Sequence, residues 1–441
     1  MILLIGVEAT ELSTAKAVRV GSEVVSPFFN SGNAFSKLNI RSASLTWVAT
    51  PTLDPVTGVP NAVTMAKVPY TDFVDKSENA WNFADGLEQR YGVEGLGSRE
   101  KKLFDKLNLI GQNQQAVLTQ AFDEMMGHQY SNTQQRLHNT GRQLDKEISH
   151  LKKEWETKSK ESNKIKIFGM REEYSTDTAG VIDYTSNSYG FAYLHEDETI
   201  KLGNSSGWYA GGVNNIFKFK DIGTSKENTL MLKVGVFKST SFDHNGSLKW
   251  TISGEGFVSK SDMHRKYLVV DEIFNAKSDY YGYGAALKNE LGKEFRISEA
   301  TSIRPYGSLK MEYGKTGPIS EKEGEMRLEI AKNDYYSIKP EIGVEFKYKK
   351  PVAKRSTLLA TLNVSYENEL GKVGDTENKG RVKYTTADWF DIPGEKDDRK
   401  GNVKADLNVG IENQRVGVTF NAGYDTKGEN TRFGVGIRAI Y

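Results

Sequence analysis

The 441-residue sequence contains no cysteine, only 10 prolines and no long apolar run. The absence of cysteine excludes a small disulfide-stapled scaffold and removes the commonest ligands of structural zinc. No segment approaches the roughly 18 consecutive apolar residues that a membrane-spanning helix needs, which excludes a helical membrane protein. The 59 basic and 58 acidic residues nearly cancel. The overall charge therefore gives no reason to expect nucleic acid or another polyanion as a partner.

The residues that are plentiful are aromatics and glycine, with 21 Tyr, 20 Phe and 42 Gly. Hydrophobic residues make up only 37% of the chain, and the mean hydropathy is −0.56. A transmembrane β-barrel has such a composition, because its strands place apolar residues at every second position and aromatic girdles mark the two membrane interfaces. The composition therefore permits a membrane protein that crosses with strands.

The last nine residues, 433–441, have the alternation of an extended strand. One face carries glycine and arginine, and the other carries the apolar residues Phe433, Val435, Ile437, Ala439 and Tyr441, with Gly436 between them. A final strand with an aromatic last residue is typical of an outer-membrane β-barrel, where it closes the cylinder. We predict that these six residues form the C-terminal assembly signal.

Alternation with period two begins near residue 164 and continues to the end of the chain. In a soluble β-sandwich such an apolar face must pack on a second sheet. Here the apolar face is long and uniform, the opposite face is polar and rich in glycine, and aromatic residues often bound the runs: Trp208, Trp250, Tyr313, Tyr348, Tyr366 and Tyr424. This pattern favours an all-β membrane barrel, apolar outside and polar inside, over a sandwich.

The length of this region predicts a barrel of about twelve antiparallel strands, at about 23 residues for each strand with its connection. The alternating segments are 165–173, 183–195, 206–219, 227–241, 246–260, 278–292, 301–314, 324–332, 336–350, 355–369, 401–412, 416–425 and 431–441. These are one too many for an even barrel. We predict that the short segment 324–332 does not span the membrane.

The first 133 residues differ from the rest in their hydrophobic periodicity. Residues 1–71 combine short β-like runs with turn signals, and are either the end of a β-solenoid or an irregular β segment. Residues 72–133 have helical spacing over 75–88, 98–109 and 113–126, with Ser98 as a predicted N-cap. Met1–Ile5 is apolar but lacks the basic residues of a signal peptide. We therefore expect the chain to be either the C-terminal part of a longer precursor or a truncated reading frame.

A long polar segment, 134–163, connects the helical region to the barrel. It is either a solvated surface helix or short coiled coil, or a helix inside a water-filled lumen, where polar residues are wanted on every side. The barrel that follows favours the lumen. The residues that we predict to characterise this pore helix are Leu137, Arg142, Leu144, Asp145, Glu147, Ile148, Leu151 and Trp155.

Several segments resemble the translocator domain of type Va autotransporters. Residues 303–309 resemble the family's strand with a Pro-Tyr step, 121–127 its junction helix ending in glycine, and 189–193 its second strand. Gly436, Ala439 and Tyr441 fit the form Gly-x-x-hydrophobic-x-aromatic, with Gly434 as a departure where a polar residue is usual. More closely, 73–441 resembles the C-terminal region of large fusobacterial autotransporter adhesins, most distinctively over 85–92 and 388–390.

This resemblance implies an outer-membrane translocator that exports and anchors an N-terminal passenger, an adhesin linked to virulence, at the cell surface. It divides the chain into the passenger end (1–71), a helical junction (72–133), the pore helix (134–163) and the barrel (164–441). The implied partners are the outer-membrane lipid and lipopolysaccharide bilayer, the barrel insertion machinery, periplasmic chaperones and the chain's own passenger. We expect a monomer without a cofactor, metal or catalytic residue.

Two other functions remain open from the residues: an outer-membrane barrel enzyme and a diffusion porin. An enzyme needs a histidine with Ser or Asp at the rim, and His195-Glu196-Asp197 is the best candidate, although an ordinary loop histidine is the favoured interpretation. A porin predicts no long helix before the first strand. Some autotransporters cut their own pore helix at an Asn-Asn pair; segment 134–163 has none, so we expect the passenger to stay attached.

Overall fold

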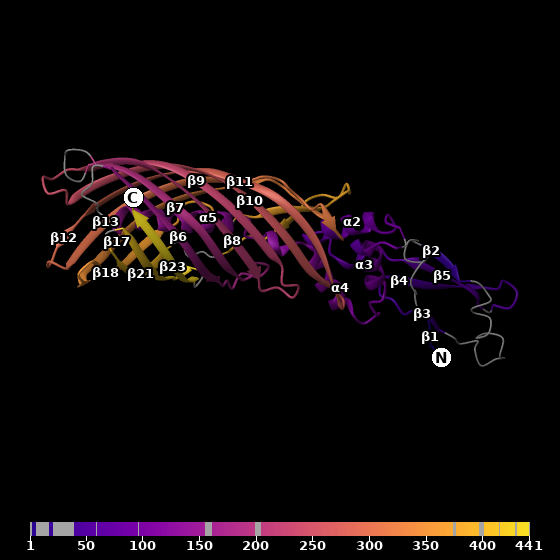
Figure 1. Cartoon of the computed structure of the whole chain (residues 1–441). Coiled ribbons are helices and arrows are strands. Elements are labelled where there is room, and N and C mark those ends of the chain that lie inside the picture. The colour runs from indigo at the N-terminus through magenta and orange to yellow at the C-terminus, as the bar shows by residue number, and fades with distance from the viewer. Residues whose placement is uncertain are drawn as a thin grey trace.

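The computed structural model describes residues 2–5, 17–20, 39–58, 60–95, 97–154, 161–198, 204–373, 376–396, 401–413, 415–427 and 430–440. A large β-barrel forms one part, and an N-terminal β region joined to a group of helices forms the other (Figure 1). Among the described residues, no helix is both long and apolar enough to cross a membrane.

The N-terminal region contains two small sheets. Its strands are β1 (Ile2–Ile5), β2 (Ala17–Val20), β3 (Asn39–Ser42), β4 (Trp47–Leu53) and β5 (Pro60–Lys67). Strands β1 and β3 pair in parallel, whereas β2, β5 and β4 form an antiparallel sheet with β5 in the middle. The described part of residues 1–71 is therefore β-rich, as predicted.

The helical region follows, with elements close to the predicted ranges. They are η3 (Tyr70–Phe73), α2 (Ala80–Arg90), α3 (Arg99–Asn108), α4 (Gln115–Met125), η4 (His128–Tyr130) and α5 (Thr133–Glu154). Ser98 is the N-cap of α3, as predicted, because its hydroxyl accepts a hydrogen bond from the backbone N–H of Lys101 at 3.1 Å. Gly127 has a φ of 81° and turns the chain from α4 toward α5.

The barrel is a closed ring of twelve antiparallel strands. The ring order is β6 (Glu161–Tyr174), β7 (Tyr184–Glu198), β8 (Ser205–Phe219), β9 (Lys226–Ser241), β10 (Leu248–Val269), β11 (Glu272–Lys293), β13 (Thr301–Thr316), β17 (Asn333–Ala353), β18 (Ser356–Asn368), β21 (Gly401–Glu412), β22 (Val416–Asp425) and β23 (Asn430–Ile440). Strand β23 pairs with β6 from Thr431–Glu173 to Ile440–Lys164 and closes the cylinder. The predicted fold class is confirmed.

The two faces of the barrel wall differ as the alternation predicts. On β23 the outer side chains Phe433, Val435 and Ile437 are 64%, 52% and 57% exposed, whereas Arg438 on the inner face is 1% exposed. The predicted girdle residues Trp208, Trp250, Tyr313, Tyr348, Tyr366 and Tyr424 are all exposed on the outer face. Tyr441 lies outside the described residues.

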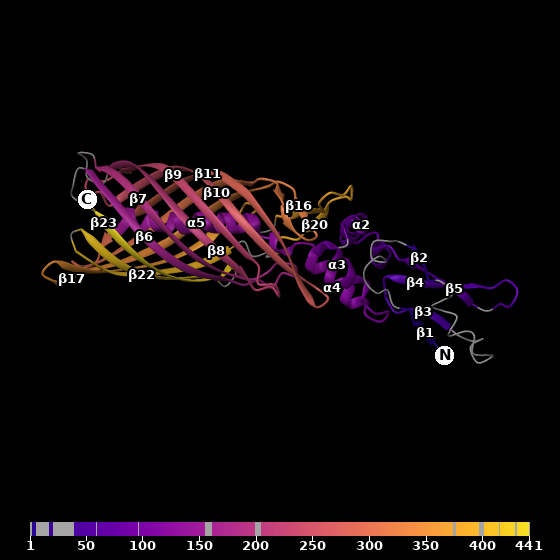
Figure 2. The ribbon, with the colours of Figure 1, turned by 45° about the vertical axis from the view of Figure 1, so that its right-hand side comes forward.

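Helix α5 runs inside the barrel, and the two ends of the barrel are not alike (Figure 2). The C-terminus lies at one end, which we call the far end, and the helices α2–α4 lie at the other, which we call the junction end. Connections at the far end are short, such as 354–355 and 413–415, whereas the junction end carries the long segments 317–332 and 369–400. Short turns and long loops at opposite ends are usual for such barrels.

Three predicted ranges need correction: those of β10, of β11 and of the segment 134–163. Strands β10 and β11 run to Val269 and from Glu272, well beyond the predicted 246–260 and 278–292. Past Lys260 the alternation reverses: the outer face becomes polar, with Asp262 and His264, and the inner face becomes mostly apolar, with Met263, Tyr267 and Val269. The predicted helical segment 134–163 was too long at its end, since Glu161–Asn163 pair with β7. Segment 324–332 was correctly predicted not to span, and contains the short strand β16 and the last residue of β15.

The junction end carries a small sheet, which we call the cap. Its strands are β14 (Ile319–Ser320), β16 (Leu328–Ile330), β19 (Asn378–Val382) and β20 (Phe390–Ile392), paired in that order. Two further short strands, β12 (Phe295–Arg296) and β15 (Glu323–Gly324), pair at the edges of the barrel sheet. The cap comes from the two longest loops, 317–332 and 369–396.

The junction helices and the barrel share one hydrophobic core. The extended ends of β10 and β11 contribute Met263, Tyr267, Val269 and Phe274, the cap contributes Leu328, Ile330, Val382, Phe390 and Ile392, and the helices contribute Phe83, Leu87, Leu103, Phe104, Phe122 and Met125. The alternation of the β10–β11 hairpin reverses because its inner face there meets helices rather than the barrel lumen.

Candidate functional site

The lumen of the barrel is the candidate site, and glycines of the wall determine how closely α5 can approach it. A Cβ on Gly211 of β8 would stand 2.7 Å from the side chain of Leu144, and one on Gly282 of β11 would stand 2.9 Å from Leu137. Side chains at these positions would collide with the two leucines. The two wall glycines thus leave room for the apolar residues of the helix.

A fully buried ion pair joins the C-terminal half of α5 to the seam where β23 and β6 close the barrel. The Lys166 ammonium on β6 lies 2.5 Å from Glu147, and both side chains are 0% exposed. Asn421 also donates to Glu147, at 3.1 Å. Gly436 on β23 faces the Lys166 stem, and a Cβ there would stand 2.5 Å from its Cε. The glycine of the predicted assembly signal therefore leaves room for the lysine to reach the helix.

Asp145 belongs to a second lumen network. Two lysines, Lys233 on β9 and Lys310 on β13, contact its carboxylate, and both also contact Glu255 on β10, at 3.2 and 3.1 Å. Lys310 further lies 2.9 Å from Glu312. The oxygens of Asp145, Glu255 and Glu312 lie within 4.8 Å of one another. Since each of these carboxylates already has a lysine at ion-pair distance, the group forms an ion-pair network.

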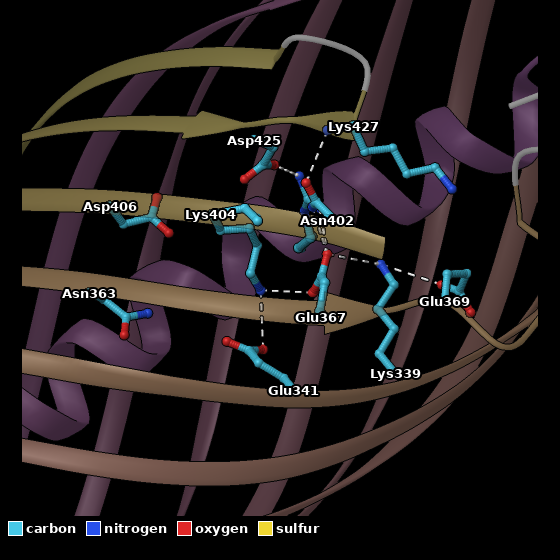
Figure 3. A network of polar contacts seen from close by, with 12 residues as sticks. Lys339, Glu341, Asn363, Glu367, Glu369, Asn402, Lys404, Asp406, Asp425 and Lys427 are labelled. Carbon is cyan, nitrogen blue, oxygen red and sulfur yellow. Dashed lines mark hydrogen bonds and ion pairs between the residues drawn. The ribbon is translucent and has the colours of Figure 1, made fainter. Parts of the chain in front are cut away.

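Arg142 connects the other side of α5 to β18 and β22. It donates to Asp425 at 2.6 Å and lies 3.7 Å from Glu367. Glu367 in turn accepts from Lys404 at 2.7 Å, and Lys404 also lies 3.1 Å from Glu341 (Figure 3). Acidic and basic groups therefore alternate across the wall beside the helix, and Arg142 meets two compensating carboxylates there.

The top of α5, at the junction end, is held by buried polar contacts. Arg136 donates to both carboxylate oxygens of Glu227, at 3.1 and 2.7 Å, and Tyr280 donates to the same carboxylate at 2.7 Å. His138 lies between Glu312 and Lys339, each at 2.8 Å. Because a lysine ammonium can only donate, His138 accepts a hydrogen bond from Lys339 at Nε2 and donates one to Glu312 from Nδ1.

The structure brings together most of the predicted pore-helix residues. The sequence did not identify the individual wall residues that contact the helix. Leu137, Leu144, Ile148 and Leu151 are buried in one apolar cluster with the wall, and Arg142, Asp145 and Glu147 make the ion pairs above. Trp155 lies outside the described residues. The missed partners are Lys166, Lys233, Lys310, Asp425 and Glu227. All are charged residues at inner positions of alternating strands, which is the signal that identifies them.

The lumen is not filled by the helix. A cavity of about 1880 Å³ lies beside α5 and is lined by charged residues of both signs, including Lys288, Glu290, Glu345 and Lys349. The lining continues to far-end residues such as Ser298 and Glu299. At the junction end, by contrast, the mouth is occupied by Arg136, Glu227 and Tyr280, with the cap beyond them.

The histidine singled out as an enzyme candidate does not gather a catalytic group among the described residues. His195 lies near the far end of β7, hydrogen-bonded to Asn163 at 2.9 Å and 3.4 Å from Asp197. Glu196 lies on the opposite face of the strand and pairs with Lys164 at 3.0 Å. The triplet is thus split between the two faces of the wall, as alternation requires.

Comparison with known proteins identifies the family. The model of the Autotransporter beta-domain family matches residues 165–425, more than half of the chain, and the chain belongs to this family. It is a translocator domain of the outer membrane, and the outer face of its barrel is the lipid-facing one. A search of curated proteins finds no match.

Solved structures of similar fold include three autotransporter domains. The translocator domain of NalP from Neisseria meningitidis has 12% identity and a TM-score of 0.51, covering 69% of this chain and 95% of that one. The beta domain of the Bordetella autotransporter Brka has 12% identity and a TM-score of 0.43, with coverages of 64% and 99%. The transport unit of AIDA-I from Escherichia coli has 10% identity and a TM-score of 0.40, with coverages of 68% and 98%.

Replacing Glu147 by leucine is expected to lower the free energy of unfolding by about 3–5 kcal/mol, because it leaves the buried Lys166 ammonium without its carboxylate. Denaturant unfolding of the purified chain in lipid vesicles measures this loss. The double variant Glu147→Leu with Lys166→Met is the control: a buried pair replaced by apolar residues of similar size is often neutral, so most of the stability returns. Equal losses in the single and double variants would contradict the pairing.

Proposed function

We propose that this translocator carries the end of an adhesin passenger through its own lumen and then retains it at the cell surface. The resemblance to large fusobacterial autotransporter adhesins supports the adhesin assignment, and with it a role in virulence. We propose the boundaries 1–71 for the passenger end and 72–133 for the junction. The pore and linker segment begins at 134, and the barrel begins at 161, the first residue of β6.

The observation that carries this proposal is the path of the chain. Strand β6 begins at the far end, beside the end of β23, whereas the junction helices lie at the junction end. Helix α5 connects the two through the lumen. Everything before α5 therefore reaches the junction end by way of the barrel interior, so we infer that the junction end faces the cell exterior.

The pore-helix contacts support a role for α5 as a plug after export. Arg142, Asp145 and Glu147 bind the wall from different sides, so the helix is fixed within the lumen rather than free to slide. Residues 433–441, with Gly436 and Tyr441, act in this proposal as the assembly signal read by the barrel insertion machinery. Periplasmic chaperones keep the chain unfolded until then, and the assembled protein is a monomer.

Epitope insertion on intact cells tests the export route. A tag placed in the exposed turn 54–58 between β4 and β5 is expected to bind antibody on intact cells. A matched tag in the turn Lys354–Arg355 between β17 and β18, at the far end, is expected to bind only after the outer membrane is permeabilised. Labelling of the second tag on intact cells, or failure to label the first on an assembled barrel, would contradict this orientation.

A further inference from the structure

Two segments about 300 residues apart in the sequence meet at the junction end. Asn79, the residue before α2, and Asp391 of β20 exchange two hydrogen bonds: the Asn79 amide donates to the Asp391 carbonyl at 2.5 Å and accepts from its N–H at 2.6 Å. One turn later, Asn82 donates to the carbonyl of Trp389 at 2.8 Å. The amide side chains of α2 thus satisfy backbone groups of the cap as a neighbouring strand would.

The apolar face of α2 fits against the same strands. The Phe83 ring meets the Phe390 ring edge to face, with centroids 5.6 Å apart, and Phe83 is 0% exposed. Gly86 lies over Val382, and a Cβ at this position would stand 2.7 Å from the valine Cβ and Cγ2. Only glycine permits this separation between helix and strand. The contact therefore depends on a specific fit.

The cap that receives α2 is itself tied to the barrel. Arg265 on β10 donates to both oxygens of Glu321, at 2.7 and 2.9 Å, and both side chains are 0% exposed. The backbone of Glu321 accepts from Lys383, at the end of β19, at 2.7 Å. At the other end of the loop, Glu395 accepts from the Tyr174 hydroxyl on β6. A load on the cap is thus transmitted to the barrel wall.

We propose that the cap is a binding surface for α2, and that this contact holds the passenger on the barrel independently of the covalent chain between α2 and α3. The proposal rests on the proposed export of the passenger to the junction end. Its occupant is this chain's own α2, because the two surfaces share a hydrophobic core, paired hydrogen bonds and a helix glycine seated on the strand. A chain cut after α2 therefore leaves the passenger bound.

A protease site inserted in the α2–α3 loop tests the binding surface in the full chain on cells. Gly95 and Gly97 in this loop are exposed, and a Cβ at either would meet no atom within 4 Å, so each glycine offers open space for the insertion. After complete cleavage of intact cells, the tagged passenger is expected to stay on the cells through repeated washing. Immediate release into the medium would overturn the proposal.

A Gly86→Ala variant identifies the contact. Alanine favours the helix itself but wedges α2 away from Val382, so the cleaved passenger is expected to leave the cell about ten-fold faster. The control Gln120→Ala makes a helix-favouring change on the exposed face of α4 and is expected to have no effect. Unchanged retention in Gly86→Ala would overturn the proposal, as would equal release in both variants.

A second variant guards against a misfolded junction. Asn79→Ala with Asn82→Ala removes the hydrogen bonds to the cap but leaves the buried face of α2 intact, and it is also expected to speed release after cleavage. Antibody labelling of the passenger tag before cleavage separates the two hypotheses. Loss of labelling before the cut contradicts the proposed export, whereas normal labelling followed by retention as firm as in the parent contradicts the binding surface.

Discussion

A Val435→Arg chain is expected to fail to assemble as a folded barrel in the outer membrane. Val435 lies in the middle of β23, is 52% exposed on the lipid-facing side, and pairs with Phe420 on one side and Gly169 on the other. An arginine at the bilayer midplane costs about 2–4 kcal/mol. In this strand the cost opposes closure of the barrel, because β23 must pair with both β22 and β6 to close the cylinder.

The same substitution at Thr431 is the matched control. Thr431 lies on the same strand and the same face, but at the junction-end edge of the barrel, where a charge costs only about 0–1 kcal/mol. Thr431→Arg is therefore expected to assemble normally. The heat-modifiable migration of the folded barrel, measured in isolated outer membranes, compares the two. Equal assembly of both variants would show that the central part of β23 is not in contact with lipid.

The alternation that made the barrel predictable is a local property of each strand. A lipid-facing strand needs an apolar residue at every second position whatever its neighbours are, so β21 and β22 were predicted with the bounds that the structure has. The same rule failed for β10 and β11 past Lys260 and before Ser278. There the strands leave the membrane, the outer face becomes polar, and the inner face packs on α3 and α4.

The cap and the ion pairs could not be predicted in the same way, because they depend on partners distant in the sequence. Strands β14 and β16 have only two and three residues, too few for a period to show. Arg142 meets Asp425 across 283 residues, and nothing local distinguishes this pair from others. The sequence did indicate the class of such residues, since charges at inner positions of alternating strands must face the lumen.

Removing α5 is expected to convert a nearly closed barrel into an open channel. With the helix present, Arg136, Glu227 and Tyr280 occupy the junction-end mouth, and the cavity of about 1880 Å³ beside α5 is open mainly toward the far end. Without it, the polar inner face of the barrel encloses water along its whole length. Single-channel conductance in planar bilayers is expected to rise several-fold, with longer open times.

Two matched chains isolate the effect of the helix. One begins at Gly127 and contains α5 and the barrel, the other begins at Glu161 and contains the barrel alone, and both retain the loops that form the cap. Heat-modifiable migration confirms that each has folded before its conductance is compared. When α5 is absent, Asp425 and Glu367 lose Arg142, and Asp406 loses Lys146. The open channel is therefore also expected to favour cations at this side of the wall. Equal conductance in the two chains would exclude α5 as the plug, since the wall charges and the cap are the same in both.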